Sequence, residues 1–159
     1  MSRTSLRITI RPAVKSDLIP AEMLERASFT HYALSARQLR YHQQKDNSIF
    51  LVAEHRNQLV GDGIALIRRH KTGLTGRIYS LVVSEELRGQ GIGGRLFAAL
   101  IAALQSRGVN RIYLEVEKSN QGAIQLYEKA GFRWAGVLHD YYSRGKHAVK
   151  MVYSRARGK

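Results

Sequence analysis

The sequence predicts an α/β (α+β) fold in which flanking helices cover a mixed central sheet of about seven strands. In the first half of the chain, short runs alternate between apolar and polar residues and are joined by tight turns, which is typical of antiparallel strands. In the second half, a strand leads through a glycine-rich turn into a long amphipathic helix and then into another strand, so these two strands are expected to be parallel. The length of 159 residues suits a single domain over 1–159, with a short basic tail at about 155–159.

Composition limits the class of protein. No apolar run approaches the roughly 18 residues that span a bilayer, and no apolar segment of a secretory signal follows the first residues, so we expect a cytoplasmic protein that does not contact membranes. The absence of cysteine excludes disulfides, thiolate nucleophiles and Cys-ligated zinc. The formal net charge of +14 indicates an anionic partner. The basic residues are spread along the chain, however, so a nucleic-acid partner is not expected, and the oligomeric state is left open.

Two short helices are expected after a first strand at 7–11. The first helix starts at Ser16 or Asp17 and would bury Leu18, Met23, Leu24 and Ala27. The second starts at Ser35, where Gln38 three residues later completes a capping box. Between the helices, Phe29, His31 and Tyr32 would either line a substrate groove or cover the core.

The remaining strands are expected at 49–53, 59–67, 77–83, 111–117, 132–138 and 148–154. The strands up to residue 83 would form an antiparallel meander. Gly61 and Gly63 lie within one of these strands and predict a bulge or a close approach of another backbone. A long helix at 91–106 ends at Gly108, and a further helix starts at Ser119 or Asn120.

The most informative segment joins the fourth strand to the long helix, and it reads Leu81-Val82-Val83-Ser84-Glu85-Glu86-Leu87-Arg88-Gly89-Gln90-Gly91-Ile92-Gly93-Gly94-Arg95. Its glycines allow a ligand to approach the main chain closely, and the free N–H groups of the helix start attract an anion. Arg88 and Arg95 flank the glycines, so the segment predicts a phosphate or pyrophosphate site. A helix start without a ligand is the alternative. The spacing of Gly89, Gly91 and Gly94 also fits a dinucleotide fingerprint, but in a Rossmann turn the first glycine follows the strand directly.

This segment resembles motif A of the GNAT superfamily of N-acetyltransferases, which is Arg or Gln, two residues, Gly, one residue, and Gly or Ala. The matching residues are Arg88-Gly89-Gln90-Gly91-Ile92-Gly93. A second segment is similar to the RimI group of ribosomal-protein alanine acetyltransferases, and it reads Leu114-Glu115-Val116-Glu117-Lys118-Ser119-Asn120-Gln121-Gly122-Ala123-Ile124-Gln125-Leu126-Tyr127. The resemblance covers nearly the whole chain. It implies a GNAT fold and acetyl-CoA as co-substrate, without a metal.

The resemblance also implies which residues bind the coenzyme. They are Leu81, Val82, Val83, Arg88, Gly89, Gln90, Gly91, Ile92, Gly93, Gly94 and Asn120. The strand residues would align the pantetheine arm through main-chain bonds, and the glycine segment would hold the pyrophosphate. Asn120 would hold the pantetheine or an ordered water, or would simply cap its helix.

Acetyl transfer requires the attacking amine to lose a proton and the departing thiolate to gain one. Tyr127 is the candidate acid, because transfer from a phenol of pKa about 10 to a thiol of pKa about 8.5 is uphill by only about 1.5 units. The resemblance to the RimI group also implies that Glu115, twelve residues before this tyrosine, is the candidate general base, acting directly or through a water. The structural alternatives are a core tyrosine and an exposed carboxylate at a sheet edge.

The sequence therefore predicts an acetyl-CoA-dependent N-acetyltransferase that acts by direct transfer, with a protein N-terminal α-amine as the favoured acceptor. A small-molecule amine acetyltransferase is one alternative, and a basic RNA- or ribosome-binding module with a regulatory acyl-CoA site is the other. After Tyr141 and Tyr142, which would wall the acceptor groove, residues 143–147 include no acidic residue. This basic segment predicts an acceptor that is acidic or that is presented on a ribosome.

Overall fold

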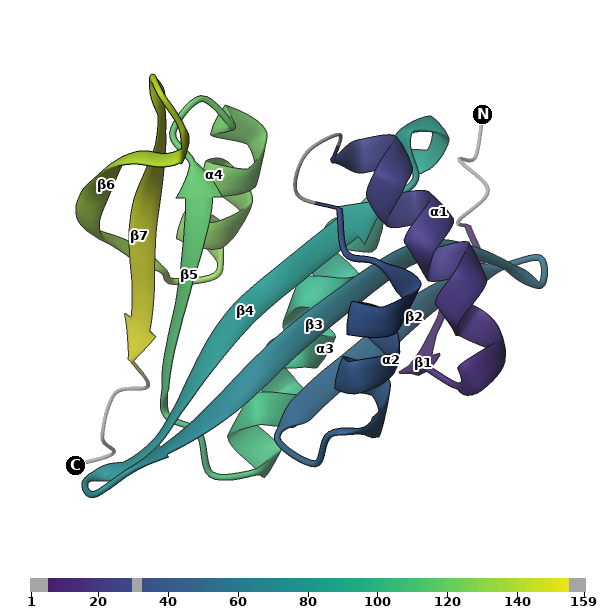
Figure 1. The fold of residues 1–159 in the computed structure, drawn as a ribbon, viewed down its shortest axis with the longest axis horizontal. Coiled ribbons are helices and arrows are strands. Elements are labelled where there is room, and N and C mark those ends of the chain that lie inside the picture. The colour runs from purple at the N-terminus through teal and green to yellow at the C-terminus, as the bar shows by residue number, and fades with distance from the viewer. Residues whose placement is uncertain (1–5, 30–32, 155–159) are drawn as a thin grey trace.

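The computed structural model describes residues 6–29 and 33–154. Within these ranges, one sheet of seven strands has the order β1-β2-β3-β4-β5-β7-β6, which confirms the predicted fold class (Figure 1). The strands are β1 (Thr9–Pro12), β2 (Ser48–His55), β3 (Gln58–His70), β4 (Gly73–Val83), β5 (Arg111–Glu117), β6 (Arg133–Ser143) and β7 (Lys146–Ser154). The helices are α1 (Leu18–Ser28), α2 (Ala36–Gln44), α3 (Ile92–Ser106) and α4 (Gln121–Lys129), with 3₁₀ turns at Lys15–Asp17 and Glu85–Leu87.

The strand directions agree with the prediction. Strands β1 to β4 pair antiparallel, and β4 pairs parallel with β5 because α3 crosses between them. Strand β7 lies between β5 and β6 and is antiparallel to both. Several strands are longer than predicted. The ladder between β3 and β4 continues through Arg68, Arg69 and His70, where backbone pairing outlasts the apolar alternation that the prediction relied on.

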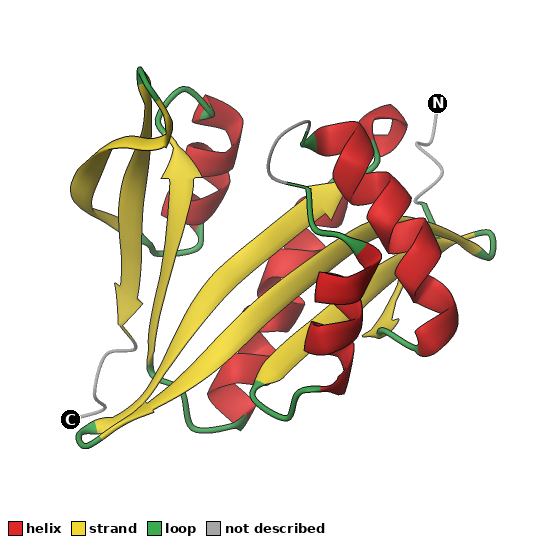
Figure 2. Cartoon of the chain, viewed as in Figure 1, coloured by secondary structure: helices red, strands yellow, loops and turns green. Residues whose placement is uncertain are grey.

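The helices cover both faces of the sheet, with α1 and α2 on one side and α3 and α4 on the other (Figure 2). Phe97 and Leu100 of α3 share a core with Tyr127 of α4. On the opposite face, Leu18 of α1 and Leu39 of α2 pack in a separate core. Each face of the sheet is therefore buried by its own pair of helices.

Gly61 and Gly63 mark a close approach, as predicted. A Cβ atom on Gly61 would lie 2.8 Å from Leu96 Cδ1, and one on Gly63 would lie 2.7 Å from Leu100 Cδ1. Side chains at either position would push α3 away from β3. The two glycines thus hold α3, including its N-terminal end, against the sheet.

The helix ends are partly as predicted. Ser35 Oγ accepts from the Gln38 backbone N–H (3.2 Å) and Gln38 Oε1 accepts from the Ser35 N–H (2.9 Å), which confirms the capping box of α2. The expected cap at Asp17 is wrong in its chemistry. Asp17 Oδ2 accepts from Arg11 Nη1 and from the Val14 N–H, both at 2.7 Å, instead of capping α1.

The inward face of α1 also differs from the prediction. Leu18, Ala21 and Glu25 are buried, whereas Met23 is 67% exposed. A glutamate on a short helix is ordinarily assigned to solvent, and this shifted the predicted apolar face. Here the Glu25 side chain points into the sheet, where Ser80 Oγ donates to its Oε1 at 2.7 Å.

Glu25 and Asp62 form a buried carboxyl pair between α1 and β3. Glu25 is 1% exposed and Asp62 is 0% exposed. Neither Asp62 oxygen meets a donor among the described residues, and its neighbouring polar group is the Glu25 carboxyl. Burial, and then the charge of Glu25, raises the pKa of Asp62 well above its usual value, and burial also raises the pKa of Glu25. Two charged carboxyls buried together without a donor would repel each other, so we predict that the pair shares a proton.

We predict that Asp62→Asn becomes progressively more stable than the parent as the pH rises. The folded pKa of Asp62 lies above the unfolded value of 3.8, so the folded protein loses stability as the pH rises from about 4 through the raised pKa. Asn has no ionisable group and can still donate a hydrogen bond to Glu25. Denaturant unfolding of both proteins at pH 5 and pH 8 measures the difference.

Asp62→Ala is the matched control. It lacks a donor for Glu25 and leaves a void, so it should be less stable than Asp62→Asn at both pH values by about 1–3 kcal/mol. A difference between the parent and Asp62→Asn that does not change with pH would contradict the shared proton.

Candidate active site

Strands β4 and β5 part after a short stretch of pairing. Thr75–Ile78 of β4 pairs with Arg111–Leu114 of β5, and beyond these residues the two strands diverge (Figure 1). Along 79–83, the edge of β4 that faces β5 therefore forms no strand pairing within the described residues. The N–H and C=O groups on this edge, apart from the Val83 carbonyl that accepts from Arg88 Nε, are available to a ligand that lies in the gap.

A β-bulge coincides with the point of parting. Ile64 of β3 pairs with Ser80, whereas Ala65 pairs with Ile78, so Tyr79 is the extra residue in β4. A bulge bends its strand and increases the local twist. It thus turns the last part of β4 away from β5 and opens the gap.

The glycine segment lies at the end of β4. Gly89 and Gly91 have φ angles of +78° and +84°, and no heavy atom lies within 4 Å of a Cβ built on either residue. Helix α3 begins at Ile92, and among the described residues no side chain caps it. The positive end of the helix therefore faces open space, as a diphosphate site requires.

The two arginines that flank the glycines have different partners. Arg88 donates from Nε to Val83 O and from Nη2 to Ser28 Oγ, both at 3.2 Å, and so remains beside the glycine segment. Arg95 Nη2 instead donates to the Ile8 carbonyl at 3.0 Å, in the segment that precedes β1. The expectation that both arginines flank the anion site is therefore wrong for Arg95.

Glu115 projects from β5 on the face opposite the α3–α4 core. Along β5 its neighbours Leu114 and Val116 are buried in that core, while Glu115 and Glu117 lie on the other face, as predicted. The side chain of Glu115 is only 12% exposed, so an exposed carboxylate is excluded. On the backbone, Glu115 pairs with Lys150 of β7, while the pairing with β4 has already ended at Leu114.

Arg77 of β4 is a site residue that the sequence analysis missed. Its Nε lies 3.0 Å from Glu115 Oε2, and its Nη2 donates to Tyr141 Oη at 3.2 Å. Burial opposes the charge of this guanidinium, yet the Glu115 carboxylate outweighs burial and raises the pKa of Arg77. The candidate base is therefore a carboxyl group held in place by an arginine. The parallel direction of β4 and β5 was predicted, but the register that sets Arg77 beside Tyr113 and close to Glu115 is a tertiary feature that no local pattern encodes.

Tyr127 is buried on α4 among aromatic rings. Its ring centroid lies 5.0 Å from that of Phe97 and 6.4 Å from that of Phe132. Burial raises the pKa of Tyr127 to about 12. Proton transfer to a thiolate of pKa about 8.5 would thus be uphill by about 3.5 units, more than the sequence analysis assumed.

Tyr142 connects the two candidate catalytic groups. Burial raises the pKa of Tyr142, and the charges of Tyr141, Glu115, Glu117 and Tyr127 raise it further. Tyr142 is therefore within electrostatic reach of both the carboxylate and the phenol. Tyr141 and Tyr142 are part of β6, and their position beside Glu115 agrees with a wall of the acceptor groove.

The other predicted residues are placed as follows. Asn120 Oδ1 accepts from the Ala123 N–H at 3.2 Å, so this side chain caps α4, and its amide N–H₂ remains for a ligand. The turn between β6 and β7 is less basic than its sequence indicates, because Asp140 Oδ1 accepts from the Gly145 N–H at 2.7 Å. Phe29 is half-buried after α1, whereas His31 and Tyr32 lie outside the described residues.

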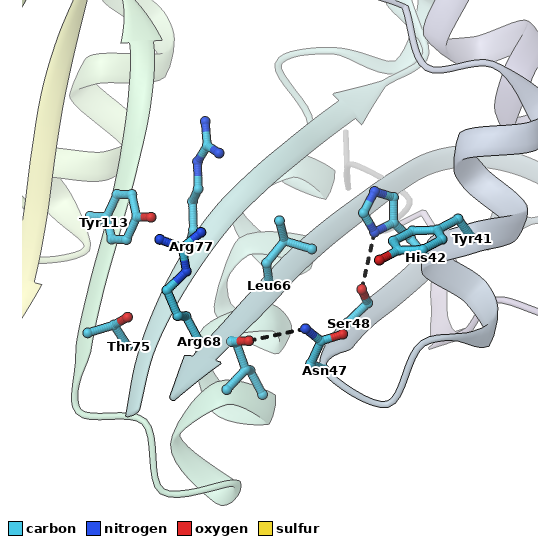
Figure 3. Close-up of a pocket in the computed structure, with 10 residues that line it drawn as sticks. Tyr41, His42, Asn47, Ser48, Leu66, Arg68, Thr75, Arg77 and Tyr113 are labelled. Carbon is cyan, nitrogen blue, oxygen red and sulfur yellow. Dashed lines mark hydrogen bonds between the residues drawn. The ribbon is translucent and has the colours of Figure 1, made fainter. Parts of the chain in front are cut away.

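A cavity of about 150 Å³ opens beside Arg77 on the α1–α2 face of the sheet (Figure 3). The described residues contain no group of three or more His, Asp or Glu side chains that could hold a metal ion. None of the helices described in 6–29 and 33–154 has the length and apolar character needed to cross a membrane.

Comparison with known proteins identifies relatives of this chain. The model of the acetyltransferase (GNAT) family matches residues 17–132. The N-alpha-acetyltransferase of Sulfurisphaera tokodaii is 34% identical over 120 residues, which are 70% of this chain and 72% of the relative. N-alpha-acetyltransferase MAK3 of Arabidopsis thaliana is 34% identical over 108 residues, and the match spans 67% of this chain but 57% of that protein.

The resemblance to the RimI group is also found. The [ribosomal protein bS18]-alanine N-acetyltransferase of Escherichia coli K12 is 40% identical over 65 residues, which are 41% of this chain and 44% of the relative. The crystal structure of the Escherichia coli ribosomal-protein-S18-alanine N-acetyltransferase has a TM-score of 0.81 at 24% identity and covers 96% of this chain and 97% of its own.

A NatC complex bound to Gag peptide and CoA has a TM-score of 0.83 at 24% identity and covers 95% of this chain and 100% of its own. These two solved structures share the fold of this chain, in agreement with the gap between β4 and β5 and the open glycine segment. The family match shows the chemistry. The chain therefore belongs to the GNAT family of acetyltransferases, enzymes that take the acetyl group from acetyl-CoA.

Proposed function

We propose that this enzyme transfers the acetyl group of acetyl-CoA to the α-amine at the N-terminus of a protein. One observation carries the proposal: the carboxyl of Glu115, held by Arg77 at 3.0 Å, lies on β5 just beyond the point where β4 and β5 stop pairing. Two relatives that are 34% identical to this chain are N-alpha-acetyltransferases, which supports the α-amine as acceptor.

The coenzyme would lie along the gap. The open amides at the start of α3 suit its diphosphate, with Arg88 beside them as a cation. The unpaired edge of β4 at Leu81–Val83 suits the amide groups of the pantetheine arm, as an added strand would. Asn120 offers its remaining amide N–H₂ to the same arm.

The ion pair of Glu115 favours a weakly basic acceptor. The Arg77 guanidinium lies 3.0 Å from Glu115, so it repels a cationic amine that approaches the base and favours an amine that is already neutral. An α-amine of pKa about 7.8 costs about 1 kcal/mol to deprotonate at pH 7, whereas a lysine of pKa about 10.4 costs about 4.6 kcal/mol. This difference supports an N-terminal amine over a lysine side chain.

Tyr127 would return a proton to the coenzyme sulfur as the thioester bond breaks. Its raised pKa keeps the phenol protonated throughout the working pH range, so the proton is always present for transfer. Protein N-termini emerge from ribosomes, so we expect this enzyme to act in the cytoplasm.

The proposal predicts acetylation of peptides that have a free α-amine. Each acceptor is incubated with acetyl-CoA, and release of the free thiol is measured. We expect turnover of peptides with a free N-terminus and little turnover of the same peptides when the N-terminus is blocked and a lysine is present, because the lysine is harder to deprotonate. Turnover confined to the blocked lysine peptides, or to small-molecule amines in the same panel, would overturn the proposed acceptor.

Replacing Tyr127 with Phe tests the proposed acid. Phe preserves the packing against Phe97 and Phe132 but removes the proton donor, so kcat should fall by about 10²-fold or more while coenzyme affinity measured by calorimetry stays nearly unchanged. Tyr153→Phe is the matched control, because Tyr153 stacks on Phe132 but its hydroxyl accepts from Gln105. A kcat for Tyr127→Phe within twofold of the parent would exclude the role.

Glu115→Gln tests the proposed base. The variant should lower kcat/KM by about 10²-fold at pH 6.5 and by less at pH 9, where an α-amine of pKa about 7.8 is already neutral. Glu117→Gln, on the same face of β5, should leave the rate within about twofold. A deficit that is equal at both pH values would show instead that Glu115 positions the acceptor.

A further inference from the structure

The cavity beside Arg77 lies where an acceptor would extend from the candidate base. Tyr41 and His42 of α2 line one side, and Tyr113 of β5 lines the other (Figure 3). Arg68 of β3 and Arg77 of β4 stand between them, with both side chains lining the cavity. The volume of about 150 Å³ suits one short side chain rather than a whole peptide.

The walls of this cavity are positively charged. No acidic residue is among those that line it. Burial lowers the pKa of His42, so this ring is neutral near pH 7. The unpaired charge of the cavity comes from Arg68, because the charge of Arg77 is shared with Glu115. Lys150 adds a further cation nearby, because its Nζ lies 4.9 Å from the Tyr113 ring.

The arginines retain hydrogen-bonding capacity. Arg77 bonds to Glu115 through Nε and to Tyr141 through Nη2, which leaves donors on Nη1. The side chain of Arg68 has no hydrogen bond or ion pair within the described part of the chain, and Arg68 is exposed and lines the cavity. A guanidinium with unused donors beside a second guanidinium is an arrangement that suits a carboxylate.

We propose that this cavity binds the carboxylate of an acidic side chain within the first three residues of the acceptor peptide. The inference rests on the proposed transfer to a protein N-terminus and names a substrate class for it. Arg77 shows that the cavity adjoins the candidate base, because its guanidinium contacts Glu115 and its side chain lines the cavity. An amine at Glu115 therefore has its neighbouring side chains, at about 3.3–3.6 Å per residue, within reach of the cavity.

The same charges disfavour basic acceptors. A lysine or arginine near the N-terminus would meet Arg68, whose charge no carboxylate of the cavity wall offsets, and Arg77, which is already paired with Glu115. From the sequence, the basic residues of 143–147 were expected to cause a preference for acidic acceptors. Asp140 folds back onto that turn, so the cavity is the better location for this preference.

The test compares matched peptides that have Glu, Gln or Lys at position 2 or 3 and a free N-terminus. For the parent enzyme, kcat/KM should be about tenfold higher for the Glu peptide than for the Gln peptide, the size of one charge-assisted hydrogen bond. Arg68→Gln should reduce that ratio to below about threefold, and Arg68→Glu should favour the Lys peptide instead. Arg69→Gln is the matched control, because Arg69 is the next residue of β3, is exposed, and does not line the cavity.

The outcomes separate this inference from the proposed function. Equal rates for the Glu and Gln peptides with the parent enzyme would overturn the inference alone, since acetylation of an N-terminus would still be observed. An acidic preference that persists unchanged in both Arg68 variants, or that is lost equally in Arg69→Gln, would also overturn it. Free glutamate that is acetylated faster than any peptide would assign the carboxylate to a small molecule and overturn the peptide assignment. No turnover of any peptide would overturn the proposed function and this inference with it.

Discussion

The site depends on the point at which β4 and β5 stop pairing. Continued pairing would occupy the N–H and C=O groups of 79–83, and no edge would be left for an extended ligand. The bulge at Tyr79 bends β4 at that point, and Gly61 and Gly63 hold α3 so that its first turn follows the end of the strand. Unpaired backbone groups need water or a ligand as partners. A gap of this shape therefore favours a long molecule with amide groups along its middle and phosphates at one end, and coenzyme A has that form.

Within the gap, Arg77 places opposing demands on Glu115. The ion pair fixes the direction of the carboxylate, which an incoming amine must then share with the guanidinium. The guanidinium also opposes the approach of a cationic amine. Both effects disfavour strongly basic acceptors and leave those whose neutral form is already common near pH 7. The electrostatics that select an α-amine and those that attract a nearby carboxylate thus come from the same side chain, which contacts the base and lines the cavity.

The sequence predicted the features that local patterns encode and missed those that depend on tertiary contacts. Apolar periodicity and the glycine cluster predicted the sheet, the crossover and α3, because strand alternation and helix starts are local. The ends of β3 and β4 were missed because their ladder continues through charged residues such as Arg68. Glu115 and Tyr127 were predicted from the motif. Arg77 could be identified only from the register in which β4 and β5 pair. The burial of Glu25 and the turning of Arg95 toward Ile8 follow from long-range contacts, and helix periodicity indicates neither of them.

The buried pair of Glu25 and Asp62 also bears on the position of β4 at the gap. Two apolar residues of equal volume would fill the space with no desolvation penalty, so the pair adds little to net stability. It does connect α1 and β3 to Ser80, the residue that follows the bulge, through the hydroxyl that donates to Glu25. An apolar pair would pack against this part of β4 in more than one register, whereas a hydrogen bond to one hydroxyl has a single satisfied geometry. The carboxyl pair therefore fixes the conformation of β4 at Ser80, where the gap opens. The proton that the two buried carboxyls share is a consequence of this position.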